Sequence, residues 1–179
     1  MKRQLLMLTA AVAFAHSAIA ADLKPAVVFD MGGKFDKSFN QGVYEGVESF
    51  KKETGIKYRE FEVTNPSQRE QALRKMAQRK ANPVLAIGFA QATALEKVAK
   101  DFPDTKFSII DAVVELPNVQ SIVFKEQEGS FLVGLLAAMK SETKAVSFVG
   151  GMDIPLIRRF NCGFAQGAKY AVKDIKVIS

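Results

Sequence analysis

Short apolar runs alternate with longer amphipathic stretches along most of the chain. Runs with the length of one buried strand occur at 25–30 (PAVVFD), 83–89 (PVLAIGF), 106–111 (KFSIID) and 118–124 (NVQSIVF). The stretch 57–63 (KYREFEV) is more polar, so we expect this strand near the edge of a sheet. Strands that alternate with helix-length segments are typical of βαβ units and a parallel sheet.

The segments between these strands carry apolar residues at helical spacing. In the first of them, 37–55, the apolar positions are Phe39, Val43, Val47 and Phe50. The same spacing predicts helices at 65–81 and 92–102. We therefore expect residues 21–123 to form one open α/β lobe with five strands and three helices.

A second lobe is predicted after Phe124. The pattern indicates a helix in GSFLVGLLAAM, a strand in KAVSFVG and a second helix that has Asp153 as its N-cap and Pro155 in its first turn. The last residues, IKVIS, have the pattern of a further strand. Two strands and two helices bury too little apolar surface for a complete lobe, so we expect 124–179 to be a truncated one.

The first twenty residues have the features of a secretory signal peptide. A basic start (MKR) precedes an apolar segment (LLMLTAAVAFA), and Ala18-Ile19-Ala20 supplies the small residues that signal peptidase requires. A membrane anchor is the alternative, but this segment is shorter than the roughly 20 residues that span a bilayer. We predict that residues 1–20 are cleaved and that the mature protein is periplasmic. The residue directly after the predicted cleavage site is Ala21 and not a cysteine, so we expect no lipid anchor.

The composition argues against several kinds of chemistry. The single histidine, His16, leaves with the predicted signal, which removes Ser-His-Asp, Cys-His and histidine metal sites from consideration. The basic residues are interspersed among acids, which does not indicate a nucleic-acid surface. Cys162 is the only cysteine, and we expect it to be a small buried residue rather than a reactive thiol. We expect a monomeric protein with no enzyme activity, cofactor or metal.

Two aspartates close predicted strands, Asp30 in PAVVFD and Asp111 in KFSIID. Ligands of open parallel sheets bind beyond the carboxyl ends of the strands. An ionised carboxylate only accepts hydrogen bonds, so this pair favours a ligand rich in donors, such as sugar hydroxyls or ring N–H groups, and disfavours phosphate. The alternative is that each aspartate caps a neighbouring helix or ends its strand in solvent.

The stretch between the first strand and the first helix combines glycines with aromatic rings. Gly32 and Gly33 allow a sharp turn and a close approach to a ligand, but their spacing matches neither common phosphate-binding motif. Phe39 begins the helix within the polar string DKSFN. From the residues alone core packing is favoured for its ring, although in a crevice the ring would stack on a base or a sugar face.

Several longer strings together indicate a known family. VVFDMGGKFDKSFNQGVYEG, AIGF, FPDTKFSIIDA, FKEQEGSFLVGLLAAM and VGGMDIPLIRRFNCGFAQGAKY occur in this order. They resemble the basic membrane protein family of ABC-transporter substrate-binding proteins, whose best-understood members are purine nucleoside receptors. The resemblance runs from about Val27 to Ile178 and implies a periplasmic-binding fold of the sugar-receptor type. Two α/β lobes of this fold clamp a ligand and deliver it to a membrane permease without chemical change.

The resemblance also implies roles for individual residues. Phe39 matches the phenylalanine that stacks on the purine, Asp30 matches an acid of the pocket, and Asp111 matches the acid that bonds the edge of the base. Asn40, beside the stacking ring, is a weaker match. The family's chain is considerably longer, so the second aromatic ring and the groups that hold ribose are expected beyond Ser179.

Other functions fit part of the pattern. A receptor for another donor-rich small molecule, such as a sugar, would use the same edge of the sheet. A hydrolase or transferase would use Asp30 and Asp36 as acid and base. A regulator with the sugar-receptor fold would need an N-terminal DNA-binding helix pair, where this chain has its predicted export signal.

Overall fold

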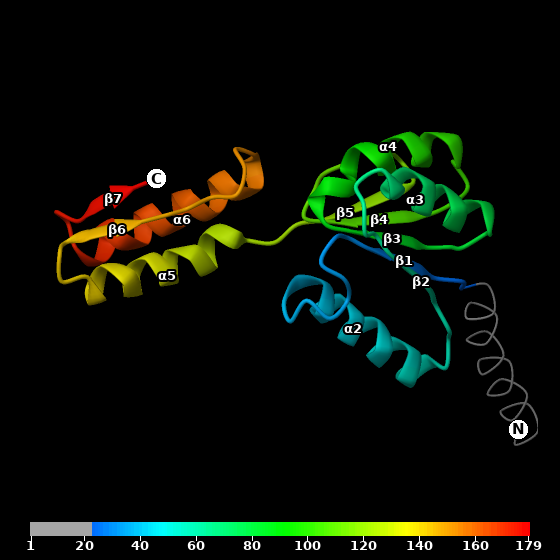
Figure 1. Cartoon of the computed structure of the whole chain (residues 1–179), viewed down its shortest axis with the longest axis horizontal. Coiled ribbons are helices and arrows are strands. Elements are labelled where there is room, and N and C mark those ends of the chain that lie inside the picture. The colour runs from blue at the N-terminus through cyan, green and yellow to red at the C-terminus, as the bar shows by residue number, and fades with distance from the viewer. Residues whose placement is uncertain (1–22) are drawn as a thin grey trace, which may run out of the picture. The chain divides into compact units, whose positions relative to one another are not determined.

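A computed structural model describes residues 23–179, which fall into two compact units. The first unit extends to Ile122 and the second runs from Val123 to Ser179 (Figure 1). The predicted signal peptide, residues 1–20, lies outside the described residues. In the part that is described, no helix is long and apolar enough to cross a bilayer.

The first unit contains a five-stranded parallel sheet with the strand order β2-β1-β3-β4-β5. Its strands are β1 (Ala26–Phe29), β2 (Arg59–Glu62), β3 (Val84–Ile87), β4 (Phe107–Ile110) and β5 (Val119–Ile122). The sequence predicted all five strands, and the polar strand β2 lies at the edge as expected. The prediction of an α/β fold built on parallel strands is therefore confirmed.

Helices cover both faces of this sheet. Figure 1 shows α2 (Phe39–Thr54) on one face and α3 (Gln68–Gln78) with α4 (Ala92–Asp101) on the other. Alternate residues of each strand point to opposite faces, so the α3 and α4 face buries Val28, and the α2 face buries Val27 and Phe29. Full burial of one such side chain stabilises the fold by about 1.5–3 kcal/mol. The helix α2 ends at Gly55, whose φ of 73° is left-handed, as its glycine allows.

The second unit packs two helices against a pair of parallel strands. Its elements are α5 (Glu126–Lys140), β6 (Ala145–Ser147), α6 (Pro155–Ala171) and β7 (Lys176–Ile178). Glycines let the helices α5 and α6 touch backbone to backbone: a Cβ atom added at Gly167 would lie 1.9 Å from the carbonyl oxygen of Phe131. A Cβ atom at Gly163 would lie 2.2 Å from the carbonyl oxygen of Gln127.

Two predictions about α6 are wrong. The N-cap is Ile154 rather than Asp153, because the carboxylate of Asp153 instead accepts hydrogen bonds from the guanidinium of Arg158 at 2.6 and 2.8 Å. Cys162 is exposed. The face of α6 that packs on α5 runs through Gly163 and Gly167, which turns Cys162 outward, where the amide of Gln166 donates to its sulfur at 2.9 Å.

Candidate functional site

Three neighbouring strands of the first unit, β1, β3 and β4, have their carboxyl ends side by side. Ala26 of β1 lies opposite Val84 of β3, and Ile87 of β3 lies opposite Ile110 of β4. Continuing this register by a few residues places Asp30, Gly88 and Asp111 in one row. Neighbouring strands lie about 4.8 Å apart, so the two aspartate Cα atoms are separated by about 10 Å, with Gly88 between them.

Asp30 is held by an arginine from another element. The Nε atom of Arg69, in the first turn of α3, donates to Oδ1 of Asp30 at 3.0 Å, and Nη2 of Arg69 lies 2.9 Å from the same oxygen. The two side chains retain 17% and 18% of their exposure. Sequence reasoning did not single out Arg69, although the start of a helix that follows a parallel strand always lies at the carboxyl edge of the sheet.

Phe39 lies beside Asp30 and Gly88, the residue that follows β3. A Cβ atom added at Gly88 would be 3.5 Å from Oδ2 of Asp30 and 3.7 Å from Cε1 of Phe39. Gly88 has a φ of 98°, a conformation that side-chain-bearing residues rarely adopt. The Phe39 side chain is 37% exposed. Its ring therefore lies at the carboxyl ends of the strands and is partly exposed to solvent, rather than buried in the core.

Asn40 has a different environment. It is 2% exposed, and its side-chain amide donates to the backbone carbonyls of Asp30 at 3.2 Å and Met31 at 3.5 Å. Its Oδ1 atom is buried and has no hydrogen-bond partner among the described residues. These bonds tie the start of α2 to the end of β1, so the present geometry of Asn40 supports the loop that carries Phe39.

Asp36 caps the helix α2. Its carboxylate accepts hydrogen bonds from the backbone N–H groups of Ser38, Asn40 and Gln41 at 2.8–3.1 Å. Desolvation alone would raise the pKa of Asp36, but these three donors outweigh it and lower the pKa below the usual 3.8. A carboxylate that is ionised and surrounded by backbone donors is poorly suited to act as a general acid.

The glycine loop is attached to the edge strand β2. Gly32 and Gly33 have φ values of 108° and 74°, which only glycine adopts readily. A Cβ atom at Gly33 would lie 3.0 Å from Oε2 of Glu62, and the same oxygen accepts the backbone N–H of Lys34 at 2.9 Å. The ammonium group of Lys34 also pairs with Glu60. The turn that the sequence predicted is thus anchored by carboxylates that it did not single out.

Asp111 directly follows β4, as Asp30 directly follows β1. It has a left-handed φ of 67°, and its backbone N–H donates to the carbonyl oxygen of Ile122 at 2.9 Å. This bond continues the ladder between β4 and β5 by one residue. Asp111 therefore lies at the same carboxyl end of the sheet as Asp30, with Gly88 between the two aspartates.

Comparison with known proteins identifies the family. The family model described as ABC transporter substrate-binding protein PnrA-like matches residues 23–179. The chain belongs to this family.

Relatives of the family support the assignment. The chain is 35% identical over 164 residues to the ABC transporter nucleoside-binding protein BmpA of Lactococcus lactis, covering 89% of this chain and 47% of that protein. An uncharacterized lipoprotein of Pyrococcus furiosus is 39% identical over 160 residues, covering 84% of this chain and 39% of the relative. The chain thus spans about half or less of the length of these relatives.

Solved structures show the same fold. A solute-binding protein of an ABC transporter system from Aeropyrum pernix matches with a TM-score of 0.77 and 30% identity over 87% of this chain and 46% of that one. A 5-methylthioribose transporter solute-binding protein from Thermotoga lettingae matches with a TM-score of 0.62 and 16% identity, over 88% of this chain and 50% of that one. The second likeness shows the fold alone.

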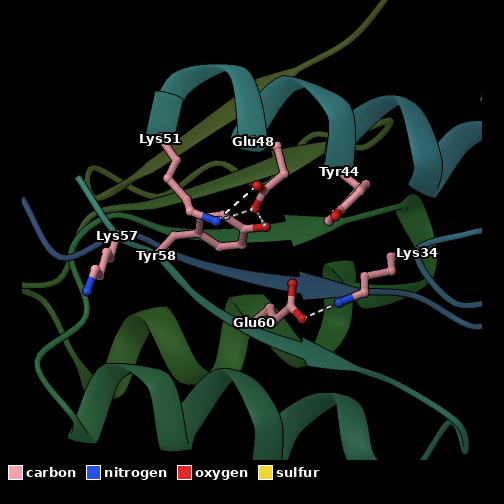
Figure 2. A pocket seen from close by; sticks show the side chains of 7 residues that line it. All are labelled: Lys34, Tyr44, Glu48, Lys51, Lys57, Tyr58 and Glu60. Carbon is pink, nitrogen blue, oxygen red and sulfur yellow. Dashed lines mark hydrogen bonds and ion pairs between the residues drawn. The ribbon is translucent and has the colours of Figure 1, made fainter. Parts of the chain in front are cut away.

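The candidate site is distinct from a polar pocket between α2 and β2 (Figure 2). This pocket, of about 480 Å³, is lined by Lys34, Tyr44, Glu48, Lys51, Lys57, Tyr58 and Glu60. Four of its charged side chains form two ion pairs, Lys34 with Glu60 and Lys51 with Glu48, and the Tyr58 hydroxyl also donates to Glu48. Burial and the bond to Glu48 raise the pKa of Tyr58. None of the four residues predicted to bind the ligand lines this pocket.

Proposed function

We propose that this chain is part of a substrate-binding protein of an ABC importer that binds a purine nucleoside. The observation that carries the proposal is the meeting of Asp30 and Phe39 beside Gly88, in one row with Asp111. An aromatic ring with a free face suits a flat base, and carboxylates suit the N–H and hydroxyl donors of a nucleoside. The name of the Lactococcus lactis relative, a nucleoside-binding protein, points to the same ligand class.

Each predicted residue has a role in this proposal. The ring of Phe39 stacks on the purine, and Asp111 accepts hydrogen bonds from the edge of the base. Asp30 accepts a hydrogen bond from a ligand donor through Oδ2, the oxygen that faces Gly88. Asn40 contributes by holding the loop that carries Phe39. Its Oδ1 atom is buried, so the loop would have to shift before Oδ1 could accept a hydrogen bond from the ligand.

The proposal includes a transport partner and no chemical step. A membrane permease would receive the nucleoside unchanged on the outer side of the cytoplasmic membrane. Within the site, Asp36 is occupied by backbone donors and Asp30 by Arg69, which disfavours the acid and base pair of a hydrolase. Incubation of the native protein with inosine and analysis for hypoxanthine would test this point, because any turnover lost in Asp30→Asn would contradict it.

Titration calorimetry on the native full-length protein tests the ligand class. We expect inosine, guanosine or adenosine to bind and free ribose to compete poorly, since ribose lacks the base that Phe39 stacks on. A receptor for sugars is the second candidate, because an aromatic ring also packs on a sugar face. Equal competition by ribose would favour that candidate and contradict the nucleoside proposal.

Localisation belongs to the same proposal. Residues 1–20 are proposed to direct export, although relatives from Pyrococcus are named lipoproteins. The intact mass of the protein recovered from the cell envelope separates the possibilities. Loss of residues 1–20 without a lipid adduct would support a periplasmic protein, whereas a lipid adduct would contradict the expectation of a free one.

A further inference from the structure

We propose that Arg69 is a specificity-determining residue of the candidate site, which orients Asp30 and makes the site select an uncharged ligand. This inference rests on the proposed function, because it concerns how the same site discriminates among nucleosides. Arg69 lies 39 positions after Asp30 in the sequence. It reaches Asp30 because α3 follows β2 and so begins at the carboxyl ends of the strands, where the neighbouring strand β1 also ends.

The geometry of the pair assigns different tasks to the two carboxylate oxygens of Asp30. Both Nε and Nη2 of Arg69 approach Oδ1, at 3.0 and 2.9 Å. The other oxygen, Oδ2, is 3.5 Å from the position that a Cβ atom on Gly88 would take, on the side where Phe39 stands. The hydrogen bonds that Asp30 receives from the described residues thus go to Oδ1, and Oδ2 is directed toward the proposed ligand.

This arrangement prepares the carboxylate before the ligand arrives. A free aspartate side chain must lose rotational freedom when it binds a ligand, and this loss weakens binding. Arg69 holds Asp30 in one orientation through a charge-assisted interaction, the strongest kind of hydrogen bond that side chains make. Both side chains are more than four-fifths buried, so solvent screens the interaction only in part.

The charge of Arg69 has a separate consequence. Without it, the carboxylate of Asp30 would place an unbalanced negative charge beside Phe39 and Gly88, which would attract cationic ligands. With Arg69 present, the charge of Asp30 is locally balanced. Arg69 therefore shifts the selectivity of the site toward a neutral donor-rich ligand and away from a cationic one of the same shape, since discrimination depends on the difference between the two binding free energies.

The test compares one neutral and one cationic nucleoside. Adenosine and 1-methyladenosine, whose base is protonated at neutral pH, are titrated into the full-length protein and into Arg69→Met. Loss of the charge and of the orientation should weaken adenosine binding by about tenfold and lower the ratio of adenosine to 1-methyladenosine affinity by a similar factor. Using the ratio cancels the steric effect of the methyl group, which is common to both proteins.

Three further variants separate charge from structure. Arg69→Lys keeps the charge and should preserve the affinity ratio while it loses part of the affinity. Asp30→Asn leaves the charge of Arg69 unbalanced and should disfavour the cationic ligand. Arg74→Met is the matched control: Arg74 lies on the same helix and pairs with Glu70 and Asp101, so its loss should leave both affinities unchanged.

The outcomes distinguish this inference from the proposed function. If the wild-type protein binds no nucleoside, the proposed function fails and the inference fails with it. If the wild-type protein binds adenosine and Arg69→Met binds both ligands as before, only the inference is overturned. A parallel loss of affinity for both ligands, with an unchanged ratio, would reduce Arg69 to a structural role and would also overturn it.

Discussion

The carboxylate of Asp36 accepts a hydrogen bond from the backbone N–H of Asn40 at 3.1 Å, and this bond closes the first turn of α2. Ser38, the residue before the helix, makes no capping bond with its own side chain. Asp36 therefore satisfies N–H groups that a helix leaves without partners at its start. Because α2 carries Phe39 and Asn40 at its N-terminus, the stability of this turn bears on the candidate site.

Removing the Asp36 cap should destabilise the first unit. Asp36→Ala loses the acceptors of three backbone donors and should lower the midpoint of thermal unfolding. Asp36→Asn retains one acceptor oxygen and should have a smaller effect. Circular dichroism of both variants checks the order of stability. Equal midpoints for the wild type and Asp36→Ala would contradict the capping role.

The effect of Asp36 should depend on pH. The folded state lowers its pKa, so its contribution is complete above the unfolded-state pKa, close to 3.8, and disappears as the pH falls through the lower folded-state value. The difference in stability between the wild type and Asp36→Ala should therefore shrink on acidification below that range. Urea unfolding at a series of pH values measures it, and a difference that persists unchanged into strong acid would argue against this origin.

Binding should depend on Phe39 and Asp111. We expect Phe39→Ala and Asp111→Ala each to weaken nucleoside binding by about tenfold or more, since each removes an interaction of about 1.4 kcal/mol or more. Titration calorimetry of the full-length variants measures the change.

Matched controls exist for both residues. Phe35, in the same loop, packs on Tyr44 with ring centroids 5.0 Å apart, so Phe35→Ala should retain binding. Asp104 precedes β4, at the amino ends of the strands, and Asp104→Ala should also retain binding. Wild-type affinity in both Phe39→Ala and Asp111→Ala would refute the assignment of the site.

Gly88 should resist substitution for a conformational reason. Its φ of 98° and ψ of 147° lie in a region of backbone conformation that only glycine adopts without strain. Gly88→Ala should therefore lower the free energy of unfolding by about 1–3 kcal/mol. Gly46→Ala is the control, because a Cβ atom there meets nothing within 4 Å in the middle of α2. That change should stabilise the helix by roughly 0.5–1 kcal/mol. Denaturant unfolding compares the two, and similar values would be inconsistent with strain at Gly88.

The helix pair of the second unit should be sensitive at its contact glycines. At Gly167 a Cβ atom would overlap the backbone of Phe131, so Gly167→Ala should force α5 and α6 apart and cost about 3 kcal/mol or more. Gly129→Ala, on α5 where a Cβ atom has open space, should be neutral or stabilising. Hydrogen exchange in α5 and α6 reports the change, and unaltered protection in Gly167→Ala would contradict the close packing.

The sequence predicted the secondary structure of the first unit well because the signals are local. Buried strands such as Ala26–Phe29 and the apolar face of Phe39–Thr54 follow from the spacing of side chains along the backbone. The errors occurred at α6, where the orientation of Cys162 depends on which face of the helix meets α5. That choice is made by Gly163 and Gly167 through a contact between helices, and helical spacing alone does not reveal it.

The candidate site divides in the same way. By itself the sequence determined that Asp30 and Asp111 follow strands and that Phe39 begins a helix, because these positions depend only on neighbours in the chain. Only the tertiary structure decided that β3 lies between β1 and β4, that Gly88 therefore separates the two aspartates, and that Arg69 pairs with Asp30. The physical reason is that strand order and the packing of α3 bring together residues far apart in sequence, and their partners are selected by the shared core and not by local spacing.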